Sequence, residues 1–174
     1  IAGQGRSLML LQSDFPTLKN LQLKSFSPRF CKKAPQWLAI SLQLPVFFWR
    51  IISEYRETRK IVANENIDLI ISDNRYGVRS RQCKSILITH QLSPKAASWA
   101  PVWFNTVLAR GIAWFANSFD EIWIPDEKPF PNGLAGELAN PRFIKTKVKT
   151  IGLLSRLKAS SITTHNISHL AIIS

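Results

Sequence analysis

Short apolar runs alternate with longer segments of helical periodicity, and this alternation constrains the fold more than any other feature of the chain. Each run has four to six residues, and the runs are Ile67–Ser72, Ser85–Thr89, Glu121–Ile124 and Val148–Gly152. Strands that are apolar on both faces are typical of a parallel sheet covered by helices. The sequence therefore predicts an α/β fold, with a doubly wound parallel sheet and helices on both of its faces.

Two long segments between these runs have the residue spacing of amphipathic helices. The first extends from Pro35 to about Val62, and Pro45 should kink it because proline removes a backbone donor and crowds the preceding turn. The second extends from Pro101 to Phe119. We expect the aromatic side chains of both helices to lie mainly in the core, and a membrane-facing role is the alternative.

The chain is basic, and its charge is unevenly distributed. Among 174 residues, 23 are Lys or Arg and 11 are Asp or Glu, which gives a net charge of +12 and favours an anionic partner. Six basic residues and no acidic one lie in Phe15–Ser53, and the same holds for Leu138–Ser174. Lys32 and Lys33 directly precede the aromatic segment Trp37–Trp49. This pattern favours an anionic membrane surface over nucleic acid.

Neither a membrane span nor a metal site is expected. The apolar segment Trp37–Trp49 has about 13 residues, fewer than the roughly 20 that cross a bilayer as a helix. Cys31 and Cys83 match no zinc spacing, and His165 and His169 have helical spacing without a third ligand. We therefore expect unpaired thiols in the reducing cytoplasm, no metal and no cofactor.

Polar residues follow the predicted strands at their carboxyl ends, where open parallel sheets bind ligands. Asp73 and His90 end consecutive strands, so the carboxylate can orient the imidazole as a general base. Arg75 is then close enough to bind an anion. Asp126 follows the third of these strands, and Gly3-Gln4-Gly5 follows a short strand at the start of the chain. These strand ends are the candidate binding edge.

Each of these residues also has a structural interpretation. Asp73 can cap a turn, and His90 can hold its loop by hydrogen bonds. Gly3-Gln4-Gly5 is too short for a dinucleotide-binding motif and can be a simple turn. The basic residues near the second strand can form a solvated face, and they are Arg75, Arg79, Arg81 and Lys84.

Five segments, taken in order, carry a resemblance to a known group of enzymes. They are Ile67–Gly77, Ile88–Leu92, Trp123–Asp126, Leu134–Leu138 and Ile151–Arg156. Together they resemble bacterial GT-B glycosyltransferases related to the N-acetylglucosaminyltransferase of lipid-linked peptidoglycan synthesis. The resemblance extends over roughly residues 1–156.

This resemblance implies two Rossmann-like domains that face a cleft, with transfer that needs no metal. The N-terminal domain binds an acceptor, commonly a lipid-linked or membrane-bound sugar, and the C-terminal domain binds a nucleotide-sugar donor. The loop Asp73-Asn74-Arg75-Tyr76-Gly77 matches the acceptor-facing loop, and His90-Gln91 matches a neighbouring strand-end motif. The peptidoglycan enzyme has His-Glu-Gln-Asn there, whereas Gln91 follows His90 directly here, so we expect a different acceptor contact.

The same resemblance divides the chain near residue 150. Residues 1–150 correspond to the acceptor-binding domain without its first strand and Gly-rich turn. Residues 151–174 correspond to the interdomain linker and, at Leu170–Ser174, the first strand of the donor-binding domain. The resemblance then places the general base upstream of Ile1 and most of the donor site beyond Ser174. No catalytic residue is therefore assigned, and we expect the chain alone to be inactive.

Two other functions compete with the glycosyltransferase prediction. One is a non-catalytic, basic, membrane-peripheral interaction domain. The other is a nucleic-acid-binding module, suggested by the charge and the six tryptophans. Such a module needs aromatic side chains among basic ones on an exposed surface, whereas most aromatics here are predicted to lie in the core. The leading prediction is a cytoplasmic glycosyltransferase at the inner face of the cell membrane, acting on a lipid-linked acceptor.

Overall fold

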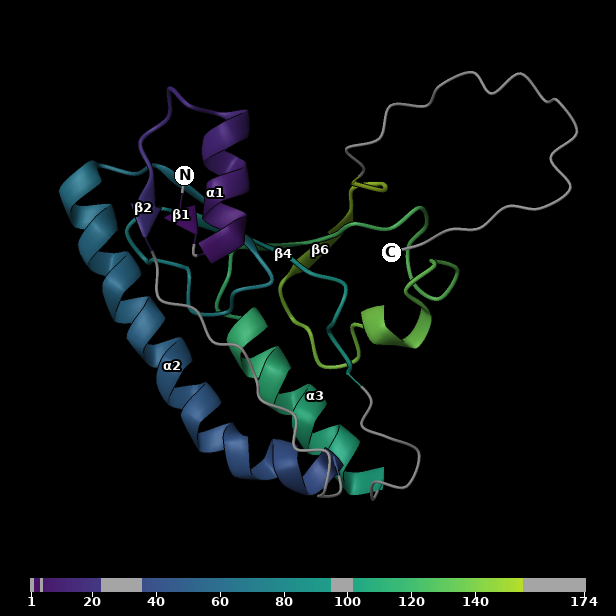
Figure 1. Cartoon of the computed structure of the whole chain (residues 1–174). Coiled ribbons are helices and arrows are strands. Elements are labelled where there is room, and N and C mark those ends of the chain that lie inside the picture. Colours follow the sequence, from purple (N-terminus) through teal and green to yellow (C-terminus); the bar gives the residue numbers. More distant parts are fainter. Residues whose placement is uncertain (1, 4, 23–35, 95–101, 155–174) are drawn as a thin grey trace, which may run out of the picture.

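The computed structural model describes residues 2–3, 5–22, 36–94 and 102–154 of the chain (Figure 1). In chain order the elements are β1 (Ala2–Gly3), α1 (Gly5–Asp14), β2 (Leu21–Gln22), α2 (Gln36–Glu65), β3 (Leu69–Asp73), β4 (Lys84–Ile88), α3 (Val102–Ala116), β5 (Glu121–Ile124), the 3-10 helix η1 (Gly136–Ala139) and β6 (Lys147–Thr150). The strands β3, β4, β5 and β6 form one parallel sheet in that order, and β1 pairs with β2 in a separate parallel pair. The predicted α/β class with a parallel sheet is confirmed.

The predicted elements agree closely with the observed ones. The first long helix, α2, continues through Pro45 without a break, and Figure 1 shows its axis changing direction in its N-terminal part. The strand predicted at Glu121–Ile124 has these bounds in the structure, and the other three strands of the sheet are shifted by one or two residues. The aromatic helix ends at Ala116, three residues before the predicted end.

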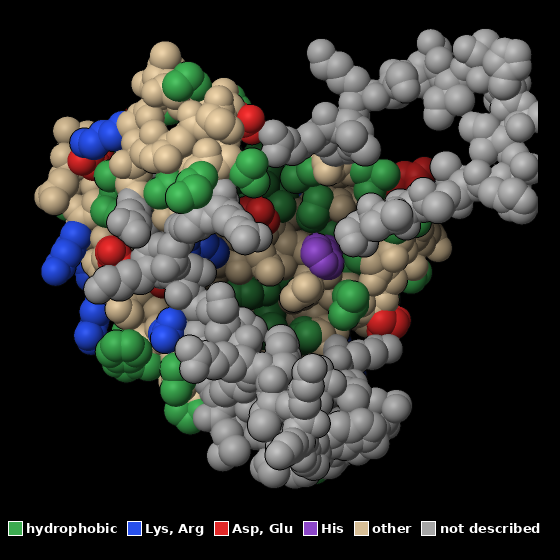
Figure 2. All heavy atoms as spheres, viewed as in Figure 1, with side chains coloured by type: hydrophobic (Ala, Val, Ile, Leu, Met, Phe, Trp, Pro, Cys, Tyr) green, Lys and Arg blue, Asp and Glu red, His purple; other side chains and the backbone are tan. Residues whose placement is uncertain are grey.

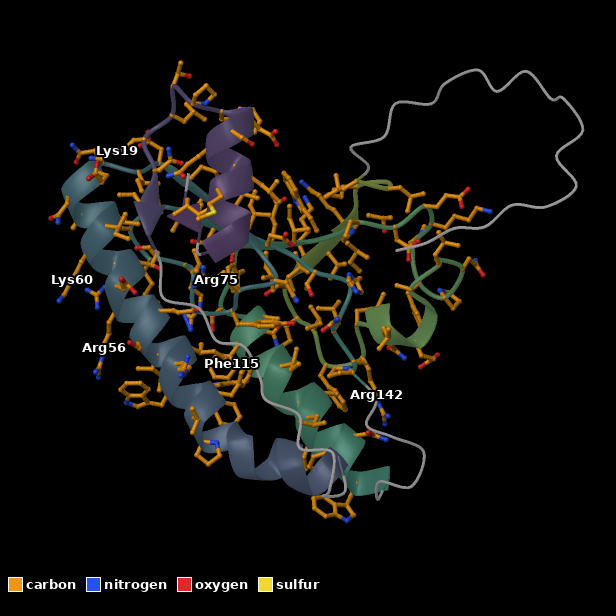
Figure 3. The ribbon with its side chains drawn as sticks, viewed as in Figure 1. Lys19, Arg56, Lys60, Arg75, Phe115 and Arg142 are labelled. Atoms are coloured by element: carbon orange, nitrogen blue, oxygen red, sulfur yellow. The ribbon has the colours of Figure 1, made fainter. Side chains whose placement is uncertain are left out.

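The core lies between the sheet and the two long helices. Leu87 of β4 and Ile122 of β5 are completely buried on the face that α2 and α3 cover. The two helices meet where Phe48 of α2 stacks on Phe115 of α3, with 5.5 Å between ring centroids. Figure 3 shows Phe115 in the space between these helices. Burying a side chain such as Leu87 stabilises the fold by about 2 kcal/mol.

The aromatic side chains of the long helices lie only partly in the core: Phe104 and Phe115 are buried as predicted, whereas the tryptophans with described side chains are exposed. Trp49, Trp103 and Trp114 are 67%, 62% and 69% exposed. The buried positions of α3 include the small residues Ala113 and Ala116, which allow close packing where an indole would not fit. Helical spacing identifies an apolar stripe, but it does not determine which of two neighbouring stripes meets the sheet.

The opposite face of the sheet is partly exposed. Burial on both faces was expected for every strand, but Leu69 and Ile71 of β3 are 47% and 53% exposed. On this face the Glu121 carboxylate accepts hydrogen bonds from Lys149 Nζ at 2.8 Å, Trp123 Nε1 at 3.0 Å and Lys84 Nζ at 3.0 Å. These donors lower the pKa of Glu121 to about 2, so the group stays ionised and joins β4, β5 and β6.

Several predictions concern residues outside the described ranges. Ile1 lies outside these ranges. The general base that the resemblance places upstream of Ile1 stays a prediction. The others include Gln4 of the glycine turn, Cys31, the basic pair Lys32 and Lys33, His165 and His169, and the strand expected at Leu170–Ser174. Ile151–Leu154 continues from β6 without forming a helix or strand. Within the described part of the chain, no helix is both long and apolar enough to cross a membrane.

Candidate functional site

The loops that follow β3 and β4 are joined at the carboxyl edge of the sheet. The parallel register pairs Asp73 with Ile88, so both strands end at the same level. The Asn74 N–H donates to the carbonyl oxygen of Ile88 at 2.9 Å, and the Thr89 hydroxyl donates to Asn74 Oδ1 at 3.0 Å. The structure therefore brings together the two strand ends that sequence reasoning proposed as one site.

Asn74 makes the sharp turn out of β3 possible. Its φ is 50°, in the left-handed region that asparagine tolerates better than most residues. The turn directs the chain back toward α2, and the Ser72 hydroxyl supports it by donating to the carbonyl oxygen of Arg75 at 2.7 Å. Asp73 and Asn74 are both exposed at this edge.

Tyr76 connects the two loops from beneath. Its side chain is 7% exposed, and its hydroxyl donates to the carbonyl oxygen of Gln91 at 3.1 Å. Burial raises the pKa of Tyr76 above its ordinary value of 10.0, although a hydrogen bond with the Thr89 side chain opposes part of the rise. The phenol therefore stays protonated and acts as a structural donor, so Tyr76 supports the edge rather than projecting from it.

Arg75 does not project from the edge either. Its Nη2 lies 2.7 Å from Glu54 Oε1 of α2, and both side chains are largely buried, with 22% and 14% exposed (Figure 3). The ion pair fixes the β3 loop to α2. The Arg75 guanidinium, which was predicted to bind an anionic ligand, contacts the carboxylate of Glu54 instead. Gly77 approaches the same helix closely, because a Cβ at this position would lie 2.6 Å from the carbonyl oxygen of Ile51.

The basic residues near β4 have different surroundings and partners. The Arg79 guanidinium carbon lies 4.7 Å from the centroid of the Tyr55 ring, which is a cation–π contact. Lys84 is held by Glu121 on the partly exposed face of the sheet. Arg81 is exposed.

Asp126 has a structural role at the end of β5. It is 2% exposed, and its Oδ1 accepts hydrogen bonds from the N–H groups of Glu127 at 2.7 Å and Leu134 at 2.8 Å. Its Oδ2 accepts from the N–H of Ala135 at 2.9 Å. The carboxylate thus closes the loop that leads to η1, and Gly133 packs directly against it. Asp126 therefore shapes this loop, and its carboxylate is occupied by backbone donors.

The exposed polar groups that remain at the edge are Asp73, Asn74, His90 and Gln91. They offer a carboxylate, two amides and an imidazole, all of which form hydrogen bonds with hydroxyl groups. The histidine in Figure 2 is His90, since the other two lie outside the described residues. Sequence reasoning missed Thr89, whose one signal was a hydroxyl at the end of an apolar strand, immediately before His90.

The β4 loop is also anchored to the β5 side of the edge. The N–H groups of Leu92 and Ser93 both donate to the carbonyl oxygen of Leu138, at 2.8 and 2.9 Å. The Ser93 hydroxyl donates to the carbonyl oxygen of Asn140 at 2.8 Å. His90 and Gln91 therefore lie between two anchored segments, which restricts how far their backbone can move.

Among the described residues, no group of three or more His, Cys, Asp or Glu side chains is placed to hold a metal ion. Cys83, the cysteine within this part of the chain, is a free, partly buried thiol. Comparison of the chain with protein-family models, with curated proteins and with solved structures found no match.

Proposed function

We propose that this chain is the acceptor-binding part of a metal-independent glycosyltransferase, which transfers a sugar from a nucleotide-sugar donor to a lipid-linked or membrane-associated acceptor. The observation that carries the proposal is the joining of the β3 and β4 loops, which presents Asp73, Asn74, His90 and Gln91 along one edge. This is the edge at which parallel α/β sheets bind ligands. The motif resemblance of the same two loops supports the same conclusion.

The chemistry of glycosyl transfer fits a division of labour between this edge and other parts of the enzyme. The reaction needs an acceptor hydroxyl assisted by a base, and a nucleoside diphosphate leaving group whose charge is stabilised. Helix N-termini and basic side chains stabilise such a diphosphate without a metal. In this proposal the residues of the edge hold the acceptor sugar, while the base and the donor site belong to the segments that the resemblance places upstream of Ile1 and beyond Ser174.

A lipid-linked acceptor would bring the protein to an anionic membrane surface, and the surface of the helices suits that location. Trp49, Trp103 and Trp114 are exposed, and indole rings are favoured at membrane interfaces. Figure 3 shows Arg56 and Lys60 along the outer side of α2, where basic side chains gather in Figure 2. The same observation favours the second candidate, a membrane-peripheral domain without catalytic activity.

A transfer assay with matched variants tests the proposal. The protein expressed from its complete reading frame is incubated with radiolabelled UDP-, GDP- and dTDP-sugars and bacterial membrane lipid vesicles. We expect labelled glycolipid from the wild type, and at least about tenfold less from Asp73→Asn and His90→Ala, because each variant loses hydrogen bonds to the acceptor.

The control is Asp68→Asn, an exposed aspartate just before the amino end of β3, which should transfer sugar at the wild-type rate. If both edge variants matched the wild type, the edge would have no part in acceptor binding. A wild type that binds anionic vesicles but labels no lipid would be the non-catalytic membrane domain.

A further inference from the structure

The hydroxyl of Thr89 connects the two loops of the candidate edge. Thr89 follows β4 directly, and its side chain is 2% exposed. Its Oγ1 donates to Asn74 Oδ1 at 3.0 Å and accepts the N–H of Gln91 at 3.1 Å. Its backbone N–H donates to the carbonyl oxygen of Trp123 at 3.0 Å. One buried residue thus joins the carboxyl ends of three neighbouring strands.

These contacts close into a ring. Asn74 is two residues before Tyr76, whose hydroxyl donates to the carbonyl oxygen of Gln91. Gln91 in turn donates its N–H to Thr89, which donates to Asn74. Asp73 and His90, the exposed carboxylate and imidazole, are the chain neighbours of Asn74 and Thr89. The ring therefore fixes the backbone from which both side chains project.

We propose that Thr89 is a positioning residue for acceptor binding. This role rests on the proposed function above. Its hydroxyl holds the β3 and β4 loops in one register, so that a single sugar with several hydroxyl groups is bound by both loops at once. Thr89 itself is buried and does not touch the acceptor. Asn74 contributes its side-chain oxygen to the ring, and Gln91 contributes its backbone N–H and carbonyl oxygen. Both residues are exposed at the edge.

The proposal depends on the hydroxyl and not on the shape of the side chain. Thr89→Val keeps the shape but can neither donate to Asn74 nor accept from Gln91, whereas Thr89→Ser keeps both hydrogen bonds. Thr58 of α2 offers a matched control, since it is also buried, at 4% exposed. Within the described part of the chain, its Oγ1 has no hydrogen-bond partner. Thr58→Val therefore removes a buried hydroxyl without breaking a ring.

Two measurements on Thr89→Val, Thr89→Ser and Thr58→Val test this role. The first is the hydrogen-exchange rate of the Gln91 amide, followed by NMR in this chain. We expect at least about tenfold faster exchange in Thr89→Val and wild-type rates in the other two. The second is steady-state transfer to the glycolipid that the wild type labels. We expect the acceptor KM of Thr89→Val to rise roughly tenfold while its donor KM is unchanged.

The possible outcomes are distinct. Wild-type acceptor KM and wild-type Gln91 exchange in Thr89→Val would overturn the role of Thr89 and leave the proposed function standing. A defect in Thr89→Ser as large as that in Thr89→Val would overturn it too, because the hydroxyl would not be the cause. A wild type without transfer activity would overturn the proposed function, and with it any positioning of an acceptor.

Discussion

Replacing Gly77 by alanine is expected to destabilise the protein by about 2–4 kcal/mol. The new Cβ would lie 2.6 Å from the carbonyl oxygen of Ile51 and 2.5 Å from the Cβ of Glu54, both within α2. Neither atom can move without displacing the helix, since one belongs to its backbone and the other is bonded to it. Relieving the overlap would separate the β3 loop from α2 and weaken the ion pair between Arg75 and Glu54.

Gly111→Ala is the matched control for this prediction. The nearest atom to a Cβ at position 111 is Phe48 Cζ at 3.8 Å, which is an ordinary contact, and Gly111 lies within α3. Alanine should therefore stabilise the protein by about 0.5–1 kcal/mol, because glycine loses more conformational freedom in a helix. Urea unfolding followed by circular dichroism measures both variants. Equal stability of the two alanine variants would show that the β3 loop at Gly77 is not in close steric contact with α2.

Replacing Asp126 by asparagine is expected to reduce the folding equilibrium constant at neutral pH by roughly a hundredfold. An asparagine amide has only one oxygen, whereas the Asp126 carboxylate accepts at least three N–H groups through two oxygens. At least one donor of the η1 loop is then left without its acceptor in a buried place. Asp68→Asn, which changes an exposed carboxylate, should leave stability nearly unchanged.

The same variant should alter the response to acid. Hydrogen bonds from the N–H groups of Ala135, Leu134 and Glu127 lower the pKa of Asp126 below its ordinary value of 3.8, against the opposing effect of burial. Because the folded pKa is the lower one, the carboxylate contributes stability above about pH 3.8 and loses it as pH falls through the folded value. Unfolding curves between pH 5 and pH 2 should show the wild type losing more stability than Asp126→Asn, in which only the other carboxylates, such as Glu121, still contribute. If the free energy of unfolding depended on pH identically in both proteins, Asp126 would not be the stabilising carboxylate described above.

The strands and long helices could be predicted from the sequence because burial imposes their periods directly. The run Glu121–Ile124 is apolar and short, and it forms β5 with those bounds. The exposed tryptophans could not be predicted in the same way. Trp103, Val107 and Trp114 have the helical spacing of a core stripe but are exposed. The buried positions of α3 are Phe104, Ala109, Ala113, Phe115 and Ala116. Which stripe faces inward depends on how closely two elements pack, and the sequence of one helix does not contain that information.

The candidate site could likewise be predicted from the sequence only in part. That Asp73 and His90 belong to one edge follows from the parallel order of their strands, and this was predicted. The partners of each polar side chain depend on register and on distant elements. Arg75 is bound by Glu54, 21 residues earlier in α2, and Thr89 binds Asn74, 15 residues earlier. Asp126 looked like a ligand-binding carboxylate but closes its own loop.

The acceptor site is tested most directly by NMR titration of this chain, labelled with ¹⁵N, against a water-soluble, short-chain prenyl diphosphate that carries one N-acetylhexosamine. We predict saturable shifts of the amide signals of Asp73, Asn74, His90 and Gln91. The signals of Asp68 and Lys84, at the amino ends of β3 and β4, should stay in place. Saturable shifts at that opposite edge, or no shift at any of these residues at millimolar ligand, would contradict the proposed acceptor site.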